Sequence, residues 1–151
     1  MTTIDKTALI VALKEKIQLQ YKQLQEDACG LQESLESEGK STAGDKHNTA
    51  RAMIHLEQEK LGAQIGQLQQ QMIALKQIET ISLGEKIGFG NLVITKKYLF
   101  LLGLSLGKIP FGDSTVFCLS LESPIGRQLQ GKKAGETLLF MKEALEIIAV
   151  K

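Results

Sequence analysis

Two stretches with helical apolar spacing, separated by one short polar stretch, dominate the first half of the chain. In the first stretch, apolar residues recur mostly three or four positions apart; they are Ile17, Tyr21, Leu24, Ala28, Leu31 and Leu35. The second stretch repeats the pattern, with Gln58 as an interruption; its residues are Ala50, Ile54, Leu61, Ile65, Leu68, Met72 and Leu75. This spacing is typical of helices that pack along a coiled-coil seam. Because the polar stretch 39–48 is short, we expect an antiparallel two-helix hairpin with its tip there.

Capping residues mark the expected ends of both helices. Gly39 is placed to end the first helix, and a residue between Asp45 and Thr49 can begin the second. Thr80, Ser82 and Gly84 mark the expected end of the second helix. Amphipathic helices also pair between chains, so the seams by themselves favour a dimer and an intramolecular hairpin equally.

After Gly84 the helical period gives way to short runs rich in β-branched and aromatic residues. Five such runs predict strands over residues 87–95, 98–106, 115–121, 137–141 and 145–150. We expect them to form a small antiparallel sheet or partly open barrel. The predicted fold class is therefore α+β, with a coiled-coil hairpin over residues 1–80 and a β domain over residues 81–151.

One short helix is expected between the third and fourth predicted strands, over residues 123–131. Ser123 suits the N-cap, Pro124 suits the first helical position and Gly131 suits the C-terminal cap. Ile125 and Leu129 are four positions apart and share one face of this helix, which we expect to cover the sheet.

Composition excludes several functional classes. The net charge is only +1, divided as −2 over residues 1–82 and +3 over residues 83–151, and the chain has no Trp and two Tyr. Direct nucleic-acid binding is not expected from so weak a charge without an aromatic stacking platform. No apolar run reaches the ~18 residues that span a bilayer, and the N-terminus lacks a signal-peptide pattern. We expect a cytoplasmic protein that does not bind membranes, has no small-molecule substrate and holds no cofactor of its own.

The residue types that carry chemistry are sparse. Cys29 and Cys118 lack metal-site spacing and are expected to be reduced core residues. His47 and His55, with Asp45, suggest a metal site only weakly, and polar roles at the tip are favoured. Asp45 can also serve simply as the cap of the second helix.

Residues 123–136, with the sequence SPIGRQLQGKKAGE, resemble a late segment of the Gre transcript-cleavage factors of bacterial RNA polymerase. The order of a helical hairpin followed by a β domain is also similar to Gre proteins, whose C-terminal domain is like that of FK506-binding proteins. Gly44-Asp45 resembles the Gre tip. The resemblance implies that the chain binds RNA polymerase, with Ser123, Pro124, Ile125, Gly126 and Arg127 at the contact.

The resemblance also implies a role for the tip. In Gre factors the hairpin enters the secondary channel, where two tip acids approach the RNA 3′ end and help to hold Mg²⁺ at the polymerase active centre. Carried over, the first acid is Asp45, a catalytic and metal-binding candidate, and the second falls on Asn48, which is neutral. The chain is thus expected to stimulate the polymerase's own RNA hydrolysis, not to act as an autonomous enzyme.

The sequence leaves two alternative functions open. Because Asn48 carries no charge, the chain can instead be a Gre-like regulator or inhibitor that occupies the channel without cleavage. A coiled-coil dimerisation protein unrelated to transcription is the third hypothesis. Prolyl isomerase activity is not expected, because five Phe and two Tyr are too few aromatic residues to line such a pocket.

Overall fold

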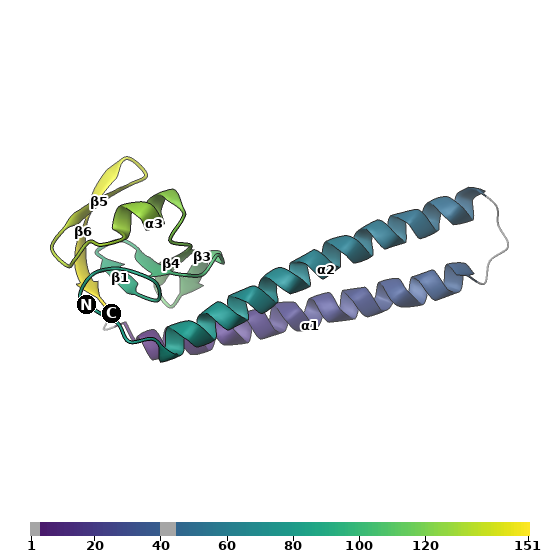
Figure 1. Ribbon diagram of the computed structural model, residues 1–151, viewed down its shortest axis with the longest axis horizontal. Coiled ribbons are helices and arrows are strands. Elements are labelled where there is room, and N and C mark those ends of the chain that lie inside the picture. The colour runs from purple at the N-terminus through teal and green to yellow at the C-terminus, as the bar shows by residue number, and fades with distance from the viewer. Residues whose placement is uncertain (1–3, 40–44) are drawn as a thin grey trace. The chain divides into compact units, whose positions relative to one another are not determined.

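The computed structural model describes residues 4–39 and 45–151 (Figure 1). This part of the chain is α+β: two long helices are followed by six strands, with one short helix between the fourth and fifth strands. The chain divides into two compact units. One, here called the arm unit, is Lys14–Gln70, and the other, the sheet unit, combines Met1–Leu13 with Gln71–Lys151.

The two long helices have the predicted ends. Helix α1 (Lys6–Gly39) has 34 residues and ends at Gly39, and helix α2 (Asp45–Thr80) has 36 residues. At ~1.5 Å per residue each is about 50 Å long. No helix in the described part of the chain is both long enough and apolar enough to cross a bilayer.

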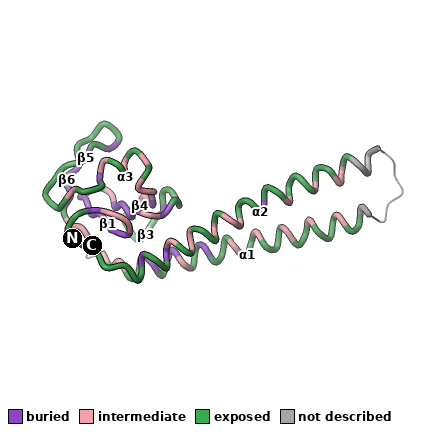
Figure 2. Tube along the Cα trace, viewed as in Figure 1, coloured by how far each residue is buried: buried purple, intermediate pink, exposed green. Residues whose placement is uncertain are grey.

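Within the arm unit, α1 and α2 run antiparallel. The Gln69 amide donates to the Tyr21 hydroxyl at 3.4 Å, and the Gln58 amide donates to the Gln32 carbonyl at 3.2 Å. From the first contact to the second, the position on α1 advances by eleven residues and the position on α2 goes back by eleven, as expected for antiparallel helices. The predicted seam positions are buried or half-buried, whereas most other positions are exposed (Figure 2). This arrangement fits a coiled coil, and Gln58 joins the seam through an amide–amide hydrogen bond.

The sheet unit contains a six-stranded mixed sheet in the order β3-β4-β2-β1-β6-β5. Its strands are β1 (Leu92–Thr95), β2 (Leu99–Leu102), β3 (Gly107–Phe111), β4 (Ser114–Leu119), β5 (Thr137–Phe140) and β6 (Glu143–Val150). Helix α3 (Pro124–Leu129) connects β4 to β5. Strands β2 and β4 are parallel, and the other neighbouring pairs are antiparallel.

The prediction of five antiparallel strands was wrong in two linked respects. Residues 107–113 fall between the second and third predicted strands, yet they contain strand β3 and the two-residue turn that joins it to β4. Pro110 obscured this strand, but proline is tolerated on an edge strand such as β3. Because the chain goes out along β3 at the edge and returns along β4, β4 runs in the same direction as β2.

Glycine turns shorten the first two predicted strands. β1 begins only at Leu92, because residues 88–91 form a turn in which the Asn91 side-chain oxygen accepts from the Gly88 main-chain amide at 2.9 Å. β2 ends at Leu102, before Gly103 with φ +112°. A Cβ on Gly103 would lie 2.6 Å from the Phe89 ring, so both the backbone and the space require glycine there.

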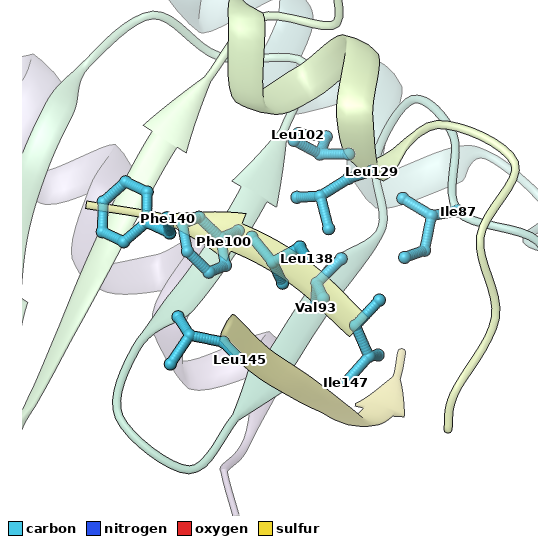
Figure 3. Close-up of a cluster of buried hydrophobic side chains, with 9 residues drawn as sticks. All are labelled: Ile87, Val93, Phe100, Leu102, Leu129, Leu138, Phe140, Leu145 and Ile147. Atoms are coloured by element: carbon cyan, nitrogen blue, oxygen red, sulfur yellow. The ribbon is translucent and has the colours of Figure 1, made fainter. Parts of the chain in front are cut away.

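The main core lies between one face of the sheet and α3 (Figure 3). Its buried members are Ile87, Val93, Phe100, Leu102, Leu129, Leu138, Phe140, Leu145 and Ile147. The partly buried Ile125 packs against this cluster, so the prediction that Ile125 and Leu129 share a covering face is confirmed.

The two cysteines have different environments. Neither forms a disulfide, but Cys118 is buried in β4 and Cys29 is exposed on α1. The expectation that both are core residues was therefore wrong for Cys29. Its position follows seam residue Ala28 directly, and consecutive helical positions point about 100° apart.

Candidate functional site

The tip candidates lie at the start of α2. Because α2 begins at Asp45, both Asp45 and Asn48 belong to its first turn, three positions apart. Their side chains, and that of His47, lie outside the described residues, so the predicted catalytic and metal-binding roles stay predictions. Nearby on the same helix, Arg51 is half-buried and His55 is exposed. Among the described side chains, no group of three or more His, Cys, Asp or Glu is placed to hold a metal ion.

The second candidate region is α3 with its cap, and Ser123 holds its start. The Ser123 hydroxyl accepts a hydrogen bond from the Gly126 amide at 3.0 Å and donates to the Ser120 carbonyl at 2.7 Å. Pro124 follows in the first turn, as predicted. One side chain thus satisfies a free amide of the helix and fixes the helix to the preceding loop.

Gly126 brings α3 against that same loop. A Cβ built on Gly126 would lie 2.1 Å from the Ser120 main-chain oxygen and 2.9 Å from main-chain atoms of Leu121. Contacts this short are not tolerated, so the helix can approach the loop only where no side chain is present. The glycine of the SPIGR segment is therefore a packing requirement of the sheet unit.

The five predicted partner-binding residues differ in exposure. Ser123 and Gly126 fix α3 to the loop, and Ile125 packs against the core. Pro124 and Arg127 are exposed. A partner that meets this segment would therefore contact Pro124 and Arg127 first, on a helix whose position the other three residues determine.

We expect the substitution Ser123→Ala to lower the free energy of unfolding of the sheet unit by about 1 kcal/mol. The change leaves the Gly126 amide and the Ser120 carbonyl without their side-chain partner. Urea unfolding followed by methyl NMR signals of the sheet unit would measure it. Ser37→Ala, at an exposed position of α1, is the control and should change stability by a few tenths of a kcal/mol at most. Equal effects of the two changes would contradict the capping role.

A basic hollow lies near the turn between β1 and β2, which sequence analysis did not single out. It has a volume of about 380 Å³, and its walls include the apolar residues Ile94 and Leu99 beside Lys96, Lys97 and Lys151. The sequence signal was the Lys96-Lys97 pair, which lies between the first and second predicted strands. None of the described residues that line it is acidic.

Two of the lysines around this hollow make hydrogen bonds to other residues. Lys97 donates to the Glu143 carboxylate at 3.1 Å, and this hydrogen bond and the opposite charge raise the pKa of Lys97. The Lys151 ammonium donates to the Ile4 carbonyl at 2.9 Å. Both contacts are exposed, and an exposed ion pair such as Lys97–Glu143 contributes little to stability.

Lys6 joins the start of α1 to the sheet. Its ammonium donates to the main-chain oxygens of Gly90 at 2.6 Å and Lys151 at 3.1 Å. Burial lowers the pKa of Lys6, because the charged form loses hydration. Since all three residues belong to the sheet unit, this contact fixes the N-terminal turn of α1 within that unit.

Four aromatic rings gather in the sheet unit: Tyr98, Phe100, Phe117 and Phe140. Each pairs with at least two of the others, with centroid separations of 5.1 to 5.7 Å. Phe100 is fully buried, and Phe140 is 8% exposed. These rings pack against one another and form part of the core.

Comparison of the chain with protein-family models, with curated proteins and with solved structures found no match. Its assignment therefore depends on its own residues, chiefly the antiparallel hairpin with Asp45 in the first turn of α2, and the capped helix α3.

Proposed function

We propose that this chain is a Gre-like transcription elongation factor that binds bacterial RNA polymerase and inserts its hairpin tip into the secondary channel. The observation that carries the proposal is the antiparallel pairing of two helices of 34 and 36 residues, whose connection directly precedes Asp45. A hairpin about 50 Å long can deliver a tip residue into a narrow channel. The resemblance of residues 123–136 to Gre proteins supports the choice of partner.

The proposed chemistry belongs to the polymerase. Hydrolysis of a phosphodiester by two metal ions needs both the attacking and the leaving oxygen stabilised. Mg²⁺ accepts one or two protein carboxylates together with phosphates and water. In the proposal, Asp45 supplies one carboxylate to Mg²⁺ of the polymerase active centre near the RNA 3′ end, and Asn48 supplies at most a neutral carbonyl.

The sheet unit is the proposed anchor on the polymerase, in the manner of the FK506-binding-protein-like domain of Gre factors. Pro124 and Arg127 are its exposed candidates for the contact. Ser123, Ile125 and Gly126 contribute by holding α3 in position.

Cleavage of RNA in a stalled, backtracked polymerase complex tests the proposal. We expect Asp45→Ala to lower the stimulated rate by about tenfold or more, and Asn48→Asp to raise it several-fold, because each changes the negative charge beside a divalent ion. Asp27→Ala, which removes an exposed carboxylate from the middle of α1, is the matched control and should leave the rate unchanged. Absence of binding to core polymerase at micromolar concentrations would reject the proposal.

The neutral Asn48 favours a second candidate function: a Gre-like regulator or inhibitor that occupies the channel without cleavage. It predicts binding to polymerase with backtracked RNA left intact, and no effect of Asp45→Ala. A concentration-dependent dimer in light scattering, together with no affinity for polymerase, would instead support a coiled-coil interaction protein unrelated to transcription.

A further inference from the structure

The two edges of the sheet are β3 and β5, and each is the first strand of a tight hairpin, β3 with β4 and β5 with β6. Two-residue turns join Phe111 to Ser114 and Phe140 to Glu143. In such hairpins the two residues that flank the turn hydrogen-bond to each other. The next residue on each strand therefore directs its main-chain N–H and C=O groups away from the partner strand. At the two edges, the first outward-facing residues are therefore Pro110 in β3 and Leu139 in β5.

Both outward-facing positions are blocked, by different means. Pro110 has no amide hydrogen to offer a further strand. Leu139 has both groups, and the side chain of Gln128 occupies them. The Gln128 amide nitrogen donates to the Leu139 carbonyl at 2.9 Å, and the Leu139 amide donates to the Gln128 carbonyl oxygen. A single side-chain amide thus supplies the donor and acceptor that a neighbouring strand would supply.

The rigid placement of α3 keeps this side chain at the edge. α3 lies beside β5 (Figure 1), its start is capped by Ser123, and Leu129, the residue after Gln128, is fully buried. The Gln128 side chain therefore meets Leu139 without ordering a flexible loop, which limits the entropy lost when the two hydrogen bonds form.

The strand behind this contact is suited to pairing with itself. Residues 137–141, TLLFM, carry no charge and no proline. Leu139 is 59% exposed and Met141 is 70% exposed. Short, uncharged, β-prone segments at an open edge pair readily with another copy. An antiparallel pairing about a two-fold axis would place the same edge opposite itself, so no other partner sequence is required.

We propose that Gln128 is a latch on the β5 edge, and that this edge is a pairing surface for a second copy of the chain once the latch is removed. The partner's β5 would then bind the Leu139 main-chain groups that Gln128 occupies. This inference does not depend on the proposed role in transcription.

Sedimentation velocity of the full chain over a range of concentrations tests the latch, with Gln128→Ala compared with the wild type. We expect the variant to self-associate about tenfold more strongly than the wild type, because two main-chain hydrogen-bonding groups and an apolar strand become available. Gln130→Ala, an exposed glutamine at the end of the same helix, is the matched control and should behave as the wild type. Adding Leu139→Lys to Gln128→Ala should return the chain to wild-type behaviour, since charge at an edge opposes pairing.

Hydrogen exchange provides a test that does not require a stable variant. In the wild type, the Leu139 amide should exchange at least about tenfold more slowly than the Thr137 amide, which occupies the other outward-facing position of β5. Equal exchange of the two amides would overturn the latch. A folded Gln128→Ala protein that sediments as the wild type would overturn the pairing surface.

Discussion

Replacing Gly126 with alanine should destabilise the sheet unit by about 3 kcal/mol or more, at the upper end of the usual cost of overpacking. The new methyl group would lie 2.1 Å from the Ser120 main-chain oxygen and 2.9 Å from main-chain atoms of Leu121. Because these are backbone atoms, no rotamer change relieves the clash, and α3 or the loop must move. Movement of α3 would also disturb Leu129 in the core and the Gln128 contact with β5.

Gly62→Ala is the matched control for this prediction. Gly62 lies within α2, and a Cβ built there meets no atom within 4 Å. The same chemical change should therefore stabilise the helix by about 0.5–1 kcal/mol, since glycine is a poor residue for a helix interior. Urea unfolding followed by NMR signals of both units would separate the two effects. A Gly126→Ala protein within 1 kcal/mol of the wild type would contradict the close approach of α3 to the loop.

Phe100→Ala should cost about 3–5 kcal/mol of unfolding free energy, since it removes a fully buried ring that packs against two others in the aromatic cluster. The Phe100 ring stacks on Phe117 at 5.7 Å and meets Phe140 edge-on at 5.2 Å. Such ring pairs add about 0.5–1.5 kcal/mol beyond their buried area. The cavity left between β2 and its neighbours could close only if the other rings moved.

Phe111→Ala makes the same chemical change at a half-buried position at the end of β3, and serves as the control. It should cost clearly less than Phe100→Ala, because less apolar surface is removed from the interior. Calorimetric unfolding of the two proteins would compare them directly. Equal costs would show that the ring cluster is not the main source of core stability.

These stability effects matter for tests of the proposed polymerase contact. Changes at Ser123, Ile125 or Gly126 alter the fold of the segment as well as any surface that it offers. Loss of binding in such variants would not identify a contact. Arg127 is exposed, so a charge change there tests the interface with less disturbance of the core.

Local sequence patterns were sufficient to predict the helices of the arm and their ends. Gly39 ends α1 as predicted, α2 ends at Thr80, the first of the three residues predicted to mark its end, and the seam positions are buried or half-buried. The Ser123 cap and the Ile125–Leu129 face were also predictable. Each of these features depends on residues within a few positions of one another, which is the range over which helical periodicity and capping act.

The sheet was predictable only in part. Apolar runs indicated most strands, but the edge strand β3 was hidden by Pro110, whose place at an edge depends on which strands are neighbours. The parallel pairing of β2 with β4 likewise follows from strand order. The tip differs from these elements. The sequence identifies Asp45 and Asn48 as candidate tip residues, and their roles stay predictions to be tested on the polymerase.

The sequence by itself thus determined two long helices whose connection lies within residues 39–48, a β-rich remainder and a capped short helix, because short-range spacing specifies such elements. Only the tertiary structure showed the order and direction of the strands, the close approach that requires Gly126, and the contact of Gln128 with Leu139. Each of these joins residues that the chain brings together by packing, since no local pattern records which backbone atoms will meet.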